Sequence, residues 1–207
     1  MLLDALVLVL LIGLVAGGRL ARLQSLELRG TWLFVSAAAA RVGLQWASAS
    51  RSSLLLALGP LLLIASYLAL LGALWMNRRI RLLWVAGIGI LLNLLVIAAN
   101  GGSMPAERAL AMRAYGPRSP LVHRLDASGY TLHRAATAST RLRFLGDVLP
   151  LPMVPPRPRW FCPGSAGDVL ITAGACATLL CGMGAFGLTG GPRRARGAAP
   201  GLPEARR

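Results

Sequence analysis

The chain has 207 residues, of which 56% are hydrophobic and only 14% are charged, against about 25% charged residues in ordinary soluble domains. A soluble protein of this length has too little interior to hide so much apolar surface. The 22 basic residues, all of them arginine, outnumber the 7 acidic residues and give a formal charge of +15. These arginines lie between apolar runs and accompany no nucleic-acid-binding motif. We therefore expect a protein whose partner is the lipid bilayer and not a nucleic acid.

Five apolar runs predict an all-α membrane protein with about five transmembrane helices. In chain order they span residues 1–18, 31–49, 54–76, 82–99 and 168–188. Each approaches the roughly 20 residues that a helix needs to cross the hydrocarbon of a bilayer. The first run carries Asp4 and has no basic region before it. We therefore expect it to be a membrane helix rather than a signal peptide.

The second run is interrupted by a polar stripe of Arg41, Gln45 and Ser48 at helical spacing. A charge at mid-depth on an isolated helix costs about 2.5–3.5 kcal/mol on insertion scales. The favoured expectation is that the Arg41 side chain extends outward to the polar edge of the membrane. The alternative is an internal ion pair between Arg41 and either Asp4 or Asp168.

Arginine placement predicts the orientation of the helices. The connections 19–29 and 77–81 hold three arginines each and the tail 189–207 holds five, whereas the opposite short segments hold only Arg51. Arginines of short connections favour the cytoplasmic side. We therefore expect the N-terminus and the long segment 100–167 outside the cell. The tail, rich in Gly, Pro, Ala and Arg, is expected to be cytoplasmic and disordered.

The long segment 100–167 has three sequence patterns of its own. Residues 105–116 predict a short amphipathic helix on the membrane surface. Residues 121–134 predict two brief extended pieces that are joined by a turn at 127–129. The proline-rich residues 149–160 predict an extended strap. Ser165 followed by Asp168 is a variant of the capping box that begins a helix.

Four motifs occur in an order that resembles a known family. They are NGGSMP at 100–105, His133, TRLRFLGDVLPLP at 140–152 and SAGDVLITAG at 165–174. Together they resemble the domain of unknown function 5317 family, a group of bacterial multi-pass membrane proteins. The resemblance covers roughly residues 93–174. It implies a location in the bacterial plasma membrane and carries over no activity.

One set of polar residues is a candidate site for a cation or a polar ligand: Asn93, Asn100, His133, Asp147 and Asp168. Asn93 and Asn100 are seven residues apart, so they share a face of the fourth helix. That face points toward the end at which Asp168 begins the fifth helix. Polar groups of membrane segments often mark functional sites. The structural interpretation, which we favour, assigns these side chains to a helix–helix hydrogen bond, helix caps and a loop brace.

No catalytic residue, cofactor or metal site is predicted, because His123 and His133 have no recognisable nucleophile and the three cysteines lack metal-ligand spacing. The preferred hypothesis is a structural or interaction module without catalytic activity. The first alternative is a small transporter or a cation- or ligand-binding component with a site at the outer mouth of helices four and five. The second is an enzyme that acts on a lipid or envelope substrate. The glycines of the fifth helix would also permit a homo-oligomer or a membrane-protein partner.

Overall fold

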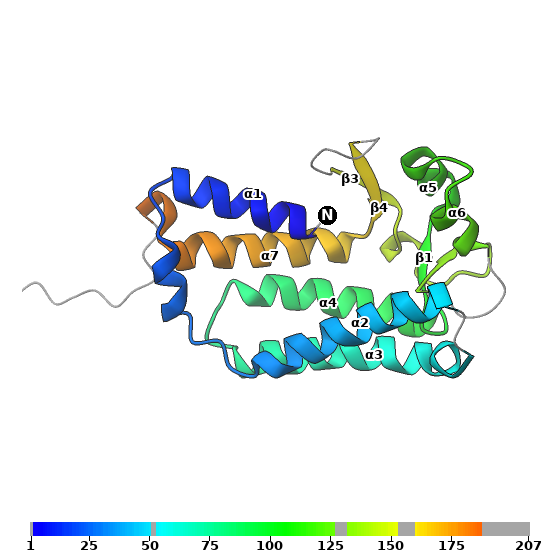
Figure 1. Ribbon diagram of the computed structural model, residues 1–207, viewed down its shortest axis with the longest axis horizontal. Coiled ribbons are helices and arrows are strands. Elements are labelled where there is room, and N and C mark those ends of the chain that lie inside the picture. Colours follow the sequence, from blue (N-terminus) through cyan, green and yellow to red (C-terminus); the bar gives the residue numbers. More distant parts are fainter. Residues whose placement is uncertain (1, 51–52, 127–131, 153–159, 188–207) are drawn as a thin grey trace, which may run out of the picture.

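The computed structural model describes residues 2–50, 53–126, 132–152 and 160–187. These residues form a mostly helical molecule (Figure 1). The helices are α1 (Leu2–Val15), α2 (Thr31–Ser50), α3 (Ser53–Met76), α4 (Leu83–Ala99), α5 (Arg108–Tyr115), α6 (Pro120–Leu125) and α7 (Ala166–Met183). The strands are β1 (Met104–Ala106), β2 (His133–Ala135), β3 (Leu149–Pro152) and β4 (Phe161–Gly164). The expectation of an all-α fold is therefore wrong for the segment between α4 and α7, which contains two small sheets.

All five apolar runs form helices, but two of them end earlier than predicted. Helix α1 ends at Val15 because Gly17 adopts a positive φ of 81° and the Gly18 N–H donates to the Gly13 carbonyl over 2.8 Å. A 3-10 helix, Leu20–Ser25, follows. Helix α7 ends at Met183 because Gly184 is left-handed, with φ of 66°. In both places a glycine with a positive φ ends the helix before the end of the predicted apolar run.

Two helices are long and apolar enough to cross a bilayer by length and composition. They comprise Ala57–Met76 of α3, with mean hydropathy 2.1, and Ala166–Met183 of α7, with mean hydropathy 1.6. Residues Ala5–Val15 and Leu83–Ala99 form shorter apolar helices. Apolar composition is thus concentrated in four of the five expected spans, and the number of spans stays a prediction.

The long helices pack as two pairs with α1 added to one side (Figure 1). Helix α2 packs along α3, and α4 packs along α7. Backbones of the second pair approach closely, because a Cβ on Gly89 would lie under 3.0 Å from the Gly167 carbonyl oxygen and a Cβ on Gly174 would lie under 3.0 Å from the Ala86 nitrogen. The main hydrophobic core joins α3 to α4 and includes Leu74 and Ile97.

One end of the helices is covered by a cap, which we define as residues 104–126, 132–152 and 160–164. Strand β1 pairs in parallel with β2, and β3 pairs antiparallel with β4. A small core of Ala106, Ala111, Val122 and Leu125 holds α5 and α6 against β1. The predicted helix within 105–116 is confirmed as α5.

Two further predictions for the cap concern the extended pieces within 121–134 and the proline-rich stretch 149–160. The first extended piece expected within 121–134 is instead helix α6, which Ser119 caps by accepting from the Leu121 N–H and which Pro120 begins. The second piece is β2. The expected turn at 127–129 lies outside the described residues. Of the proline-rich stretch, Leu149–Pro152 is extended as predicted, whereas 153–159 lie outside the described residues, as does the tail 189–207.

The connections at the opposite end of the molecule carry arginines. The connections 16–30 and 77–82 and the end of α7 all lie there (Figure 1). Buried Asn77 joins the first two: its Nδ2 donates to the Arg29 carbonyl over 2.7 Å, and the Arg29 N–H donates to its Oδ1 over 2.8 Å. Trp75 and Trp84 meet edge to face beside this connection, with ring centroids 6.3 Å apart. The arginine-rich end is therefore an ordered structure.

Candidate functional site

A cavity of about 160 Å³, which we call the inner cavity, lies where the cap meets the helices. It is lined by Arg41, Gln45, Leu63, Tyr67, Asn93, Ile97, Met104, Leu132, His133, Asp147 and Asp168. Four of the five residues predicted as a polar site therefore come together, and Asn100 does not line the cavity. Arg41, Gln45 and Tyr67 add polar groups that the predicted set did not include.

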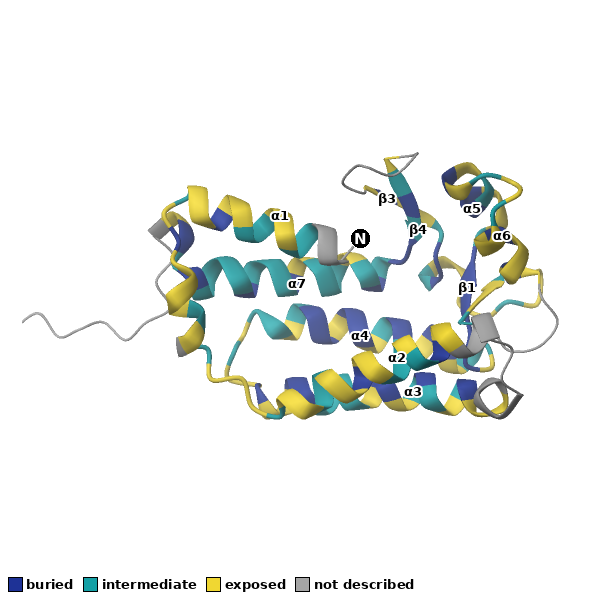
Figure 2. Cartoon of the chain, viewed as in Figure 1, coloured by how far each residue is buried: buried dark blue, intermediate teal, exposed yellow. Residues whose placement is uncertain are grey.

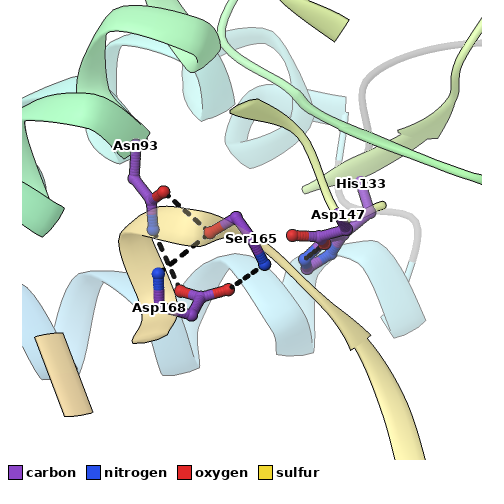
Figure 3. A network of polar contacts seen from close by, with 5 residues as sticks. All are labelled: Asn93, His133, Asp147, Ser165 and Asp168. Atoms are coloured by element: carbon purple, nitrogen blue, oxygen red, sulfur yellow. Dashed lines mark hydrogen bonds and ion pairs between the residues drawn. The ribbon is translucent and has the colours of Figure 1, made fainter. Parts of the chain in front are cut away.

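Asn93, Ser165 and Asp168 form a closed ring of hydrogen bonds (Figure 3). The Asn93 Nδ2 donates to Asp168 Oδ1 and the Ser165 hydroxyl donates to Asn93 Oδ1, each over 2.9 Å. The Asp168 N–H donates to Ser165 Oγ and the Ser165 N–H donates to Asp168 Oδ2, each over 3.0 Å. This confirms the capping box at the start of α7. It also confirms that Asn93 forms a bond between helices, so the ring is first of all a structural brace.

The local sequence explains why this ring can form. Strand β4 delivers Ser165 directly to the N-cap position of α7, and Asp168 is three residues later. A Cβ on Gly167 would lie under 3.0 Å from both the Asn93 Oδ1 and the Gly89 carbonyl oxygen. Only glycine at 167 therefore lets α4 bring its amide onto the end of α7.

His133 and Asp147 form a second polar group beside the ring (Figure 3). The His133 Nε2 lies 3.4 Å from Asp147 Oδ2, and the Asp147 side chain is only 8% exposed, against 53% for His133. Strand β1 positions both residues: Met104 pairs with His133, and the Asp147 N–H donates to the Pro105 carbonyl over 2.8 Å. Burial raises the pKa of Asp147 to about 6, while His133 acts in the opposite direction and Asp168 adds to the increase.

Asn100 has a different role from the one expected for a ligand. It is the C-cap of α4, and its Nδ2 donates to the carbonyls of Val96 and Arg141 over 2.7 and 2.8 Å. The Arg141 N–H donates to its Oδ1 over 2.9 Å. Asn100 therefore holds the loop before Asp147 against the end of α4, which agrees with the cap predicted for it.

Arg41 lies against the inner cavity and packs on α3, and its extension to the polar edge of the membrane stays a prediction. Its guanidinium carbon lies 4.2 Å from the centre of the Tyr67 ring, and its Nε donates to Ser66 Oγ over 3.4 Å. Its Nη2 is buried and has no hydrogen-bond partner among the described residues. Arg41 and Asp168 line the same cavity, as the alternative interpretation required, although no ion pair joins them among the described residues. The side chain of Asp4 lies outside the described part.

The cavity combines one guanidinium, two carboxylates and an imidazole. The described residues that line it include no serine, threonine or cysteine, and the Ser165 hydroxyl is fully engaged in the ring. No group of three or more His, Cys, Asp or Glu residues in the described ranges has the arrangement of a metal site. The arrangement therefore suits hydrogen bonding and charge pairing with a small molecule.

The sequence was compared with protein families, curated proteins and solved structures. No curated protein and no solved structure matches the chain. The sequence model of a family of unknown function, DUF5317, matches residues 25–180, which include every residue that lines the inner cavity. The chain belongs to this family, DUF5317.

Proposed function

We propose that this protein is a ligand-binding component of the bacterial plasma membrane, with a small anionic molecule held in the inner cavity. Helices α1 to α4 and α7 cross the bilayer, the cap covers their outer ends, and the arginine-rich end faces the cytoplasm. The cavity then opens toward the outside of the cell, where Gln45 and His133 are exposed.

Exposed apolar side chains support the membrane part of the proposal. Val7 and Leu11 of α1, Val35 of α2, and Leu61 and Leu68 of α3 are each more than half exposed. Figure 2 shows such exposed positions along α1, α2 and α3. A surface of this kind is unfavourable in water and suits contact with lipid. The arginines of connections 19–29 and 77–81 lie together at one end, which supports the proposed orientation.

The unpartnered Nη2 of Arg41 is the observation that carries the ligand proposal. A buried donor without a partner costs free energy, more so when it is charged. Arg41 is held toward the cavity by Tyr67 and Ser66, so its orientation does not depend on a ligand. A planar guanidinium presents paired donors that match a carboxylate or a phosphate. An anionic oxygen in the cavity would satisfy the donor.

The two carboxylates of the cavity do not prevent an anion from binding. The charge of Asp168 is stabilised by the Asn93 amide, by the Ser165 N–H and by the N-terminus of α7. Asp147 is buried beside His133, and its pKa is raised to about 6, so this carboxyl is neutral at pH values below 6. The guanidinium, in contrast, keeps one buried donor, its Nη2, for which the described residues offer no acceptor.

Binding explains the cavity better than catalysis does. The contact of 3.4 Å between His133 and Asp147 is the pairing of a base and an acid that an enzyme would need. However, no serine, threonine or cysteine that could act as its nucleophile is among the described residues that line the cavity. The hypothesis of a purely structural module gives no reason for the unpartnered donor of Arg41.

The proposal is tested with purified full-length protein in lipid nanodiscs. Acetate and inorganic phosphate serve as probes, with methylammonium as a cation control, all at constant ionic strength. We expect acetate or phosphate to raise the thermal unfolding midpoint, because a ligand that binds only the folded state stabilises it. The variant Arg41→Gln should lose this increase. The variant Arg113→Gln, at an exposed arginine of the cap, should keep it.

Two results would contradict the proposal. The first is that neither anion stabilises the wild-type protein. The second is that Arg41→Gln responds to the anions as strongly as the wild-type protein does, which would place the binding site elsewhere.

A further inference from the structure

A second cavity, of about 150 Å³, lies within the cap, and we call it the outer cavity. It is lined by Ala106, Ala111, Tyr115, Leu121, Leu125, His133, Asp147 and Pro163. Apart from the histidine, the aspartate and the hydroxyl of Tyr115, these residues of α5, α6 and the strands present apolar groups. The outer cavity therefore suits an uncharged, apolar group.

Two alanines, whose side chains are single methyl groups, leave space for the outer cavity. Ala106 and Ala111 are each 3% exposed, and both belong to the small core of the cap. Leu121 is 51% exposed and Tyr115 is 37% exposed, so these two residues stand nearer the surface. Apolar cavities of about 150 Å³ hold a molecule the size of benzene. An apolar group of roughly six carbons would thus fit.

His133 and Asp147 line both cavities and are therefore the boundary between them. The His133 Nε2 and Asp147 Oδ2 atoms lie 3.4 Å apart, which is longer than a good hydrogen bond. Strand β1 fixes the backbone of each residue, whereas the His133 side chain is more than half exposed. A group that passes beside the imidazole would occupy space on both sides of the pair.

We propose that the two cavities form one site for an amphipathic anion. Its acidic group lies in the inner cavity at Arg41, and its short apolar chain passes His133 and Asp147 into the outer cavity. This inference rests on the proposed function and adds the chemical class of the ligand, a molecule with an anionic head and an apolar part of up to about six carbons. Shared lining residues and opposite polarity at the two ends favour one occupant over two.

The test uses a chain-length series of acetate, butanoate and hexanoate, measured by calorimetry on the full-length protein in lipid nanodiscs, with empty nanodiscs subtracted. Each added methylene should tighten binding by up to about fourfold, since burying one is worth about 0.8 kcal/mol. The variant Ala111→Leu fills the outer cavity, so it should remove the gain in affinity from acetate to hexanoate. The control Ala109→Leu places the same side chain on the exposed face of α5 and should behave like the wild-type protein.

If Ala111→Leu does not fold, Leu121→Glu provides a second variant. The Leu121 side chain is half exposed, so the fold can accommodate a charge at this position. The Leu121→Glu variant should weaken hexanoate binding more than acetate binding. Arg41-dependent acetate binding with no gain from chain length would overturn the amphipathic site and leave the proposed function standing. A gain from chain length that persists in Ala111→Leu and Leu121→Glu would also overturn it. Failure of all three acids to bind would overturn the amphipathic site, and the proposed function would be rejected as well if inorganic phosphate also failed to stabilise the protein.

Discussion

At the scale of single residues, Asp147 is a carboxyl of the site whose pKa is raised by burial. It is buried, and the groups that face it are His133 of β2, Asp168 of α7, and Arg41 and Tyr67 across the inner cavity. Burial is the largest cause of its raised pKa. The neighbouring imidazole of His133 lowers the pKa by less than burial raises it. The folded protein therefore holds a proton on Asp147 at pH values at which the unfolded chain has lost it.

The variant Asp147→Asn should consequently change stability in a pH-dependent way. The pKa of Asp147 rises from 3.8 to about 6 on folding, so its contribution to the free energy of unfolding falls as the pH rises between these values and is constant above them. The amide that replaces the carboxylate has no charge to bury. We expect Asp147→Asn to be more stable than the wild-type protein at pH 8 and the difference to shrink toward pH 4, as followed by thermal unfolding midpoints. A variant that is less stable at pH 8 would mean that attraction to His133 outweighs burial.

The polar site could be predicted from the sequence in part. Ser165 and Asp168 follow a local capping pattern, and Asn93 is an amide within an apolar run, so each was recognisable without a structure. The meeting of His133 with Asp147 depends on β1 pairing with segments far away in the sequence, which no local pattern encodes. The direction of Arg41 depends on which side of α2 faces α3. Helical spacing identifies the polar stripe on α2, but it does not identify α3 as the helix that the stripe contacts.

At the scale of helices and strands, the pair α4–α7 depends on glycines. Gly174 was expected to permit contact between copies of the chain, but it contacts Ala86 of the same chain. Gly182 likewise contacts Leu26, and Gly184 contacts Arg22. These glycines therefore serve packing within one chain, and the homo-oligomer stays a prediction.

Substituting Gly174 tests this packing. A Cβ at this position would lie under 3.0 Å from a backbone nitrogen of α4, which cannot move as a flexible side chain would. We expect Gly174→Ala to destabilise the protein by about 1–3 kcal/mol, the usual effect of overpacking. Gly43→Ala is a matched control on α2, because nothing lies within 4 Å of its added Cβ. This variant should be neutral or gain up to about 1 kcal/mol. Equal unfolding midpoints for the two variants would argue against a close α4–α7 contact.

Helices were easier to predict than strands, and there is a physical reason. An apolar run of nearly 20 residues has one favourable backbone conformation in an apolar environment, so α2, α3 and α4 begin and end within one residue of the predicted runs. The strands of the cap have three or four residues each, too few for a period of two to be recognised. Their conformation is fixed by pairing with distant segments.

At the scale of the whole molecule, the cap and the arginine-rich connections lie at opposite ends of the helices (Figure 1). The proposed orientation predicts how each end reacts with a membrane-impermeant thiol reagent in intact cells. Arg118→Cys, at an exposed position of the cap, should be labelled directly. Arg79→Cys, at an exposed position of the opposite end, should be labelled only after permeabilisation. The unmodified chain, with its three native cysteines, is the baseline. The reverse pattern would invert the topology.

The pairing of the helices divides the walls of the inner cavity between two halves of the protein. Arg41 and Tyr67 belong to α2 and α3, whereas Asn93 and Asp168 belong to α4 and α7. The second half is locked by backbone contact at Gly89 and Gly174, while the first is joined to it through side chains between α3 and α4. A molecule that spans the cavity would therefore contact both halves. Its binding would favour the arrangement of the two pairs in which side chains of both reach it.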